Sequence, residues 1–131
     1  MTPRALSYTH GTTEVALCGE TIGEMWSDAV ARYGDREALV SRHQGIRWTY
    51  AELDAQAERC ARALLASGVA RGDRVGIWSP NAAEWVVVQF ATARIGAILV
   101  NLNPDYRTHE LEYALRQSGC TLLVLAQGYK G

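Results

Sequence analysis

Three short apolar runs, separated by amphipathic stretches, dominate the second half of the chain. They are RVGIWS (74–79), AILVNL (97–102) and TLLVLA (121–126). Their apolar and β-branched character is typical of strands that are buried on both faces of a sheet. Between them lie AAEWVVVQFATARIG (82–96) and THELEYALRQSG (108–119), which we expect to be helices. The order strand, helix, strand, helix, strand predicts a parallel βαβαβ sheet with right-handed crossovers, and therefore an α/β fold.

Capping signals predict where these two helices begin. Asn81 is expected to cap the first, with Glu84 in its first turn, where a carboxylate favours the positive end of the helix dipole. Pro104 closes the second strand, and Thr108 is expected to cap the second helix.

The first half of the chain predicts a helix followed by a β-hairpin. Thr21 and Glu24 have the spacing of a capping box, and Gly34 is placed to end the helix. The runs EALVSR (37–42) and GIRWTY (45–50) flank a turn that contains glycine, which indicates a hairpin. The apolar positions of the helix recur at helical spacing and predict one buried face: Ile22, Met25, Trp26, Ala29, Val30 and Tyr33.

A further capping box, Thr49 with Glu52, predicts a helix that follows the hairpin and runs to Gly68. Its expected apolar stripe consists of Leu53, Ala57, Cys60, Ala61, Leu64 and Leu65.

Composition limits the class of protein. The chain has 131 residues, of which 48% are hydrophobic and 21% charged, so we expect one folded domain with a real core. Residues 1–20, rich in Thr and Gly, are expected to form an extended arm, and 21–131 the α/β unit. The formal net charge of −1 gives no basic field for nucleic acid, which we do not expect as a partner.

The three cysteines, Cys18, Cys60 and Cys120, are far apart and form no CxxC pair. They suggest neither a disulfide framework nor a zinc site, and a reducing, cytoplasmic location fits them best. No apolar stretch is long enough for a signal peptide or a membrane span, so we expect a soluble protein.

Ligands of open parallel sheets bind beyond the carboxyl ends of the strands. Those ends are WSPN (78–81), NLNPDY (101–106) and AQGYKG (126–131). None contains the GxGxxG or GxxxxGK[ST] pattern that cradles phosphates, which argues against a small Rossmann-type nucleotide-binding domain.

Structural roles explain the polar residues at these strand ends at least as well as ligand contacts do. Pro80 restrains a turn and Asn81 caps a helix, while Asn101 and Asn103 suit a strand end that needs local backbone hydrogen bonds. Two alternatives stay open: Ser79-Pro80-Asn81 as a polar cluster over a pocket, and a polar contact between a ligand and Asn101 or Asn103.

Neither the histidines nor the tryptophans indicate a site. The histidines share no helical or strand face and show no Ser-His-Asp or Cys-His arrangement, and core packing explains the tryptophans better than stacking on a nucleobase. These residues are His10, His43 and His109, and Trp26, Trp48, Trp78 and Trp85.

Several segments together resemble the adenylate-forming acyl-CoA synthetases, the AMP-dependent synthetase and ligase family. They are WTYAEL (48–53), VARGDRVGIWSPN (69–81), ATARIGA (91–97) and NLNPDYR (101–107), and the resemblance extends from Thr21 to about Ala126. The combination is most similar to bacterial medium- or long-chain fatty-acyl-CoA synthetases, with aryl- or small-acid ligases as the alternative.

The resemblance implies a two-step reaction for a complete enzyme. A fatty acid attacks the α-phosphate of Mg²⁺-ATP to give an acyl-adenylate and pyrophosphate, and the thiol of CoA then displaces AMP. The phosphate loop, the acidic metal-binding residue, the ribose-binding aspartate and the lysine of the C-terminal domain have no match here; Thr12-Thr13 lacks the glycines and lysine of that loop. We therefore name no catalytic, cofactor-binding or metal-binding residue and interpret the chain as an N-terminal segment that ends before the loop.

An alternative function is a stand-alone, non-catalytic module that self-associates or docks on a full-length synthetase. An exposed apolar strand at TLLVLA would favour it, because an unpaired strand edge invites a partner. A sheet that ends after three parallel strands would leave one face poorly covered, so we expect a homo-oligomer or marginal stability. Contact with a membrane surface and the acyl chain length are left open by the sequence.

We predict that the 131-residue chain alone forms no acyl-adenylate and binds neither ATP, Mg²⁺ nor CoA productively, because adenylation needs cations and backbone donors around the triphosphate. Fatty-acid-dependent release of pyrophosphate by the purified chain, with ATP supplied, would refute this prediction.

Overall fold

The computed structural model describes residues 11, 14–15 and 17–128. Most of the arm expected over 1–20, the Thr12-Thr13 pair and the end of the AQGYKG segment lie outside this range. The elements are α1 (Ile22–Tyr33), β1 (Glu37–Ser41), β2 (Ile46–Thr49), α2 (Tyr50–Ala66), β3 (Arg74–Trp78), α3 (Ala83–Ile95), β4 (Ile98–Leu102), α4 (Thr108–Ser118) and β5 (Cys120–Leu125).

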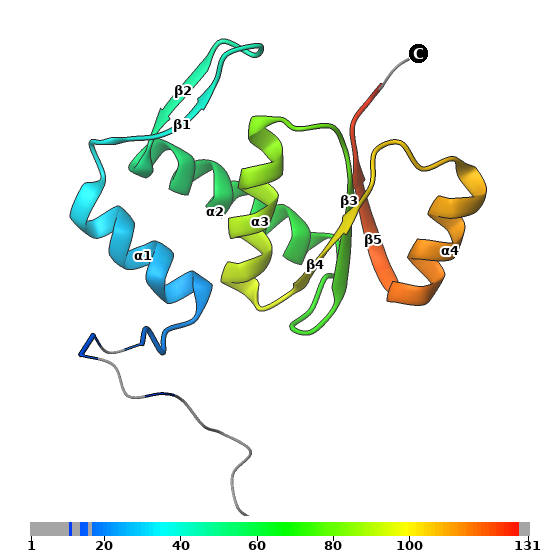
Figure 1. Cartoon of the computed structure of the whole chain (residues 1–131), viewed down its shortest axis with the longest axis horizontal. Helices are drawn as coiled ribbons and strands as arrows, with labels where there is room; N and C mark the ends of the chain where they lie inside the picture. The colour runs from blue at the N-terminus through cyan, green and yellow to red at the C-terminus, as the bar shows by residue number, and fades with distance from the viewer. Residues whose placement is uncertain (1–10, 12–13, 16, 129–131) are drawn as a thin grey trace, which may run out of the picture.

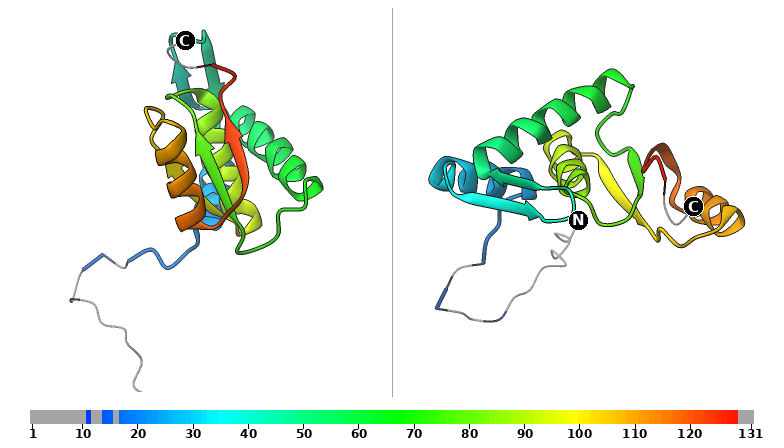
Figure 2. Two further views of the ribbon diagram at one scale, coloured as in Figure 1. Left: turned by 90° about the vertical axis from the view of Figure 1, so that its right-hand side faces the viewer. Right: turned by 90° about the horizontal axis from the view of Figure 1, so that it is seen from above.

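The predicted α/β fold is confirmed. The main sheet has the order β4-β3-β5, with both pairs parallel, so β3 lies in the middle. Helices α2 and α3 lie on one side of this sheet and α4 on the other (Figure 1). β1 and β2 form the predicted antiparallel hairpin, which projects from the body beside α2 (Figures 1 and 2).

Burial differs sharply between the central strand and its neighbours. Val75 and Ile77 of β3 are 0% and 1% exposed, whereas Ile98 of β4 and Leu125 of β5 are 46% and 56% exposed. The expectation that all three strands are buried on both faces is therefore right for β3 and wrong for β4 and β5. The reason is topological: β4 and β5 are the edges of the sheet formed by the described residues.

Two apolar clusters fill the space between the sheet and the helices. The first joins α2 and α3 to the sheet and contains Ala61, Leu64, Val69, Val75 and Ala91. The second brings Trp26, Leu53 and Val87 from three helices together. In the second cluster the Trp26 ring stacks on Phe90 with the centroids 3.9 Å apart, which confirms a core role for Trp26.

The predicted apolar face of α1 is only partly buried. Trp26 is 5% exposed, but Ile22, Met25 and Tyr33 are 54%, 45% and 42% exposed. Periodicity identified the apolar positions correctly, but α1 lies at the margin of the body and contacts α2 and α3 along a narrow strip (Figure 1). Leu65, predicted to belong to the stripe of α2, is likewise 53% exposed.

Local signals place most of the element ends. The capping boxes of Thr21 with Glu24 and of Thr49 with Glu52 are both formed. Gly34 ends α1 as predicted, but in a right-handed conformation. Gly96 closes α3 with a φ of +70°, and its carbonyl accepts a hydrogen bond from the Gly72 amide at 2.9 Å, so helix end and strand start are held together.

A single carboxylate, Asp54 of α2, ties the three helices together. Its Oδ1 accepts a hydrogen bond from Nε1 of Trp26 at 2.7 Å, and it also forms an ion pair with Arg94 of α3. Both charged side chains are less than one-third exposed, so this pair is better shielded from water than the pairs within single helices. Asp54 therefore satisfies the indole of the core tryptophan and anchors α1 and α3 to α2.

We predict that Asp54→Ala lowers the free energy of unfolding by roughly 1.5–3 kcal/mol, because it leaves the indole N–H and the guanidinium without their common acceptor. Asp54→Asn keeps an acceptor for Trp26 and should cost less. Urea titration measures both. Asp28→Ala, which breaks the exposed pair with Arg32, is the matched control and should change stability by less than about 0.5 kcal/mol. Equal losses at Asp54 and Asp28 would contradict the role given to Asp54.

Candidate functional site

The connectivity of the sheet creates a crevice at one end of β3. The chain passes from β3 through α3 to β4 on one side, and then crosses through α4 to β5 on the other side of β3. Helices α3 and α4 lie on opposite faces of the sheet, so the loops that lead to them from β3 and β4 diverge (Figure 1). Such a switch of direction is where open α/β sheets bind ligands.

A pocket of about 620 Å³ occupies this position, and we call it the switch-point pocket. All three strand ends singled out from the sequence contribute to it. Its volume falls in the range of small-molecule sites. The lining residues are Trp78, Ser79 and Pro80 after β3, Pro104, Asp105, Tyr106 and Arg107 after β4, and Leu125, Ala126, Gln127 and Gly128 after β5.

The β4–α4 loop is braced by local hydrogen bonds. Asn103 accepts a bond from the Asp105 amide through Oδ1 at 3.0 Å, and its carbonyl accepts one from Nε1 of Trp78 at 3.0 Å. The structural interpretation of Asn103 is therefore confirmed, and the indole of Trp78 is fixed in the pocket wall. Asn101 is exposed and does not line the pocket.

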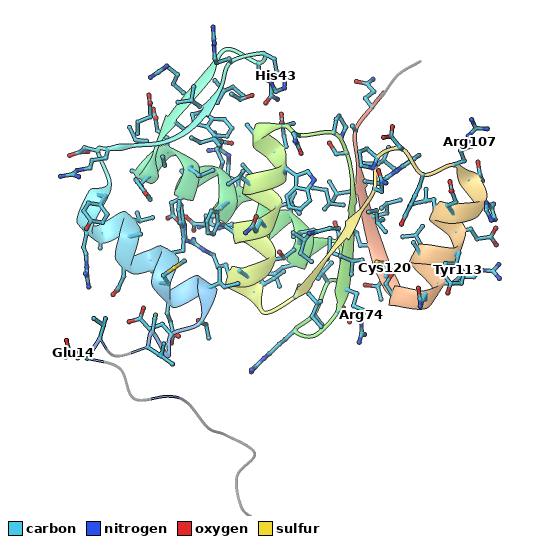
Figure 3. The ribbon with its side chains drawn as sticks, in the orientation of Figure 1. Glu14, His43, Arg74, Arg107, Tyr113 and Cys120 are labelled. Atoms are coloured by element: carbon cyan, nitrogen blue, oxygen red, sulfur yellow. The ribbon has the colours of Figure 1, made fainter. Side chains whose placement is uncertain are left out.

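Arg107, at the start of α4, is among the residues that line the pocket, and its exposed side chain lies at the outer end of α4 (Figure 3). It is the N-cap of α4, and its amide donates to the Glu110 carboxylate at 2.8 Å. The prediction that Thr108 caps this helix is wrong by one residue, because Glu110 satisfies the first orphan amide and Thr108 becomes helical. With the Asp105 carboxylate nearby in the wall, the pocket offers both charges beside the rings of Trp78 and Tyr106.

The prediction that Asn81 caps α3 is also wrong. The N-cap is Ala82, which makes no capping bond through its side chain, and Asn81 is exposed. The role is taken by Gln44 of the hairpin turn, whose Oε1 accepts a bond from the Ala83 amide at 2.8 Å. No local sequence signal identifies this cap, because 39 residues separate the partners.

Gln44 also acts on the electrostatics of the helix start. Its Nε2 donates to the Glu84 carboxylate at 2.8 Å. This hydrogen bond, helped by the backbone amide of Glu84 itself and the nearby His43, lowers the pKa of Glu84 below the usual 4.5. Glu84 therefore stays ionised at the positive end of the α3 dipole.

The remaining sequence candidates form no second site. The Sγ of Cys120 lies 3.2 Å from Oγ of Ser118, burial raises the pKa of the Cys60 thiol, and all three cysteines are free. His43 lies 3.4 Å from Oγ of Ser41 in the hairpin turn. Within the described residues no group of three histidine, cysteine or acidic side chains could hold a metal ion. The described helices include none long and apolar enough to cross a membrane.

Known proteins match most of the chain. The AMP-binding enzyme family matches residues 26–130. Medium-chain acyl-CoA ligase ACSF2, mitochondrial, is 44% identical over 125 residues in Mus musculus and 46% over 124 in Danio rerio; each match covers 95% of this chain and 20% of the relative. The chain thus spans about a fifth of the length of the curated relatives it matches.

Solved structures give the same result. A fatty acyl CoA synthetase of Mycobacterium tuberculosis superposes with a TM-score of 0.78 at 32% identity, over 80% of this chain and 21% of that chain. The N-terminal domain of FACL13 from the same organism superposes with a TM-score of 0.78 at 32% identity, over 80% of this chain and 26% of that chain. The N-terminal subdomain of Klebsiella oxytoca NpsA shares the fold. It superposes with a TM-score of 0.77 at 24% identity, over 84% of this chain and 28% of that chain.

We predict that the bond from Gln44 makes Glu84 a source of acid sensitivity. A lowered pKa in the folded state contributes stability above the unfolded pKa, and this is lost as pH falls through the folded value. From about pH 5 to pH 3, unfolding free energies should therefore fall more steeply for the wild type than for Glu84→Gln. Glu112→Gln, on the exposed ion pair with Arg116, is the control and should follow the wild type more closely. Parallel curves for wild type and Glu84→Gln would refute the prediction.

Proposed function

The chain belongs to the AMP-binding enzyme family, and on that premise we propose that it forms the N-terminal α/β part of an AMP-forming fatty-acyl-CoA synthetase. The observation that carries the proposal is the match of nearly the whole chain to medium-chain acyl-CoA ligases at more than 40% identity. A similar fatty acyl CoA synthetase with the same fold supports it. In the proposed reaction a fatty acid and ATP give an acyl-adenylate and pyrophosphate, and CoA then displaces AMP.

The switch-point pocket is proposed to form one wall of the substrate site in the complete enzyme. Trp78 and Tyr106 provide flat apolar surface, and Arg107 provides a cation at the rim. All three substrates carry anionic groups, which a cation at the rim of a partly apolar pocket attracts. The described residues do not fit Mg²⁺, since they contain no cluster of ligands, and we assign no step through the metal to them. The catalytic residues of the synthetase are proposed to lie outside this chain.

Several features of organisation belong to the same proposal. We assign an extended arm to 1–20 and the α/β subdomain, ending before the phosphate-binding loop, to 21–131. A cytoplasmic location agrees with three free cysteines, although the relatives named above are mitochondrial. A homo-oligomer and peripheral contact with a membrane are further proposals; the exposed Leu125 on edge strand β5 supports the first.

The same exposed edge favours a second candidate function, a stand-alone module that associates with itself or with a full-length synthetase. β5 pairs with β3 on one side, and no other strand of the described chain covers its second edge. A module of this kind would bind its partner through the free edge of β5, and the switch-point pocket would have no role in its function. The two functions differ in whether the pocket must be intact for catalysis.

A chimeric enzyme tests the proposed function. Residues 26–130 replace the matching segment of mouse ACSF2, and AMP formation is measured with ATP, CoA and a medium-chain fatty acid. We expect kcat/KM within about tenfold of unmodified ACSF2, a loss of transition-state stabilisation of no more than about 1.4 kcal/mol.

Two controls make the result interpretable. ACSF2 without the segment should be inactive, and the chimera with Arg107→Gln should show a raised KM for one anionic substrate if the pocket is part of the site. A folded chimera that forms no AMP would contradict the proposed function and leave the stand-alone module as the better account.

A further inference from the structure

We propose that Gln44, at the tip of the hairpin, is a positioning residue that fixes the β3–α3 wall of the switch-point pocket. The inference rests on the proposed function for its effect on catalysis, but its structural part stands on the described contacts alone. Gln44 does not line the pocket; it acts through the start of α3.

The Gln44 side chain makes three hydrogen bonds that fix its orientation. Oε1 accepts from the hydroxyl of Ser41 at 2.7 Å and from the amide of Ala83 at 2.8 Å, which uses both of its lone pairs. Nε2 donates to the Glu84 carboxylate at 2.8 Å. Because the Ala83 N–H can only donate and the Glu84 carboxylate can only accept, reversing the side-chain amide would break both of these bonds.

The start of α3 depends on this contact because the Ala83 amide that it caps is partly buried. Ala83 is 1% exposed, and Ser41, whose hydroxyl donates a hydrogen bond to Gln44, is 8% exposed. The N-cap Ala82 offers no side-chain acceptor. Without Gln44 this partly buried amide would lose its hydrogen-bond acceptor, which weakens the start of the helix.

The position of α3 sets the position of the pocket wall. The four residues 79–82 connect the end of β3 to the first residue of α3, and Ser79 and Pro80 line the pocket. One end of this loop is fixed where the Trp78 carbonyl accepts a bond from the Ala126 amide at 3.2 Å. Gln44 fixes the other end at Ala83, so a loop this short has little freedom to move while both contacts hold.

The hairpin thus reaches the pocket through a chain of direct contacts. Its tip approaches the top of α3 in Figure 3, where His43 is labelled beside it. Ser41, Gln44, Ala83 and the loop 79–82 form this chain, and any movement of the hairpin relative to α3 would be transmitted to Ser79 and Pro80.

The most direct test of this positioning role exchanges the glutamine at position 44 with the glutamate at position 84. Gln44→Ala removes all three bonds. Gln44→Glu keeps acceptors for Ser41 and Ala83 but places a second carboxylate against Glu84. The double variant Gln44→Glu with Glu84→Gln reverses the polarity of that contact and restores every bond. Arg47→Ala, which breaks the exposed ion pair with Glu37 on the same hairpin, is the matched control.

Amide hydrogen exchange of the full chain reports the positioning directly. Gln44→Ala should accelerate exchange by roughly fivefold or more at Ala83, which loses its acceptor, and at Trp85 and Ala126, whose amides donate to carbonyls at the two ends of the loop. The double variant should return the rates toward the wild type, and Arg47→Ala should leave them unchanged. Faster exchange at Ala83 with unchanged rates at Trp85 and Ala126 would overturn the proposal, as would no change at all.

The ACSF2 chimera adds the catalytic readout. With KM measured separately for fatty acid, ATP and CoA, Gln44→Ala should raise the KM of the one substrate that occupies the pocket by roughly threefold to tenfold, with a smaller change in kcat. The double variant should recover it. If Gln44→Ala left the KM of each of the three substrates as it is in the unsubstituted chimera, the inference would be overturned. An unsubstituted chimera without activity would count against the proposed function, and the exchange data would then decide the role of Gln44.

Discussion

Burial of the central strand β3 is the constraint on which the rest of the structure depends. Its two edges are paired with β4 and β5, and its apolar side chains lie under the helices. Gly76 at its centre is tightly packed: a Cβ there would lie 3.1–3.3 Å from side-chain atoms of Leu102, Cys120 and Leu123, which would have to shift by a few tenths of an ångström. Because the chain leaves β3 in one direction and returns on its other side, the same strand that anchors the core also creates the switch-point pocket.

Hydrophobic burial, and not surface charge, accounts for most of this stability. Complete burial of a residue such as Ile77 or Leu53 stabilises the fold by about 1.5–3 kcal/mol, whereas an exposed pair such as Arg62 with Glu58 contributes about 0–1 kcal/mol. The polar contacts that matter are the shielded ones. Asp54 joins three helices, and Gln44 joins the hairpin to α3.

The sequence was sufficient wherever the deciding interactions are local. The capping boxes at Thr21 and Thr49, the hairpin turn and the strand–helix alternation involve neighbours in the chain, and the structure confirms them. The three strand ends that line the pocket could also be named from the sequence, because they follow the apolar runs of a parallel sheet. Predictions failed where tertiary contacts decide. Gln44, which is distant in the sequence, caps α3 in place of the predicted Asn81. Ile22 and Met25 are exposed because α1 has no neighbour on that side among the described residues.

The most direct test of the account is an activity measurement on the native gene product, captured from its own cells with an antibody to residues 21–126. The quantity to measure is AMP formed in the presence of ATP and CoA, with and without a series of fatty acids. The account predicts AMP formation that requires a fatty acid and yields the matching acyl-CoA in equal amount. A captured protein that forms no AMP with any fatty acid would contradict it.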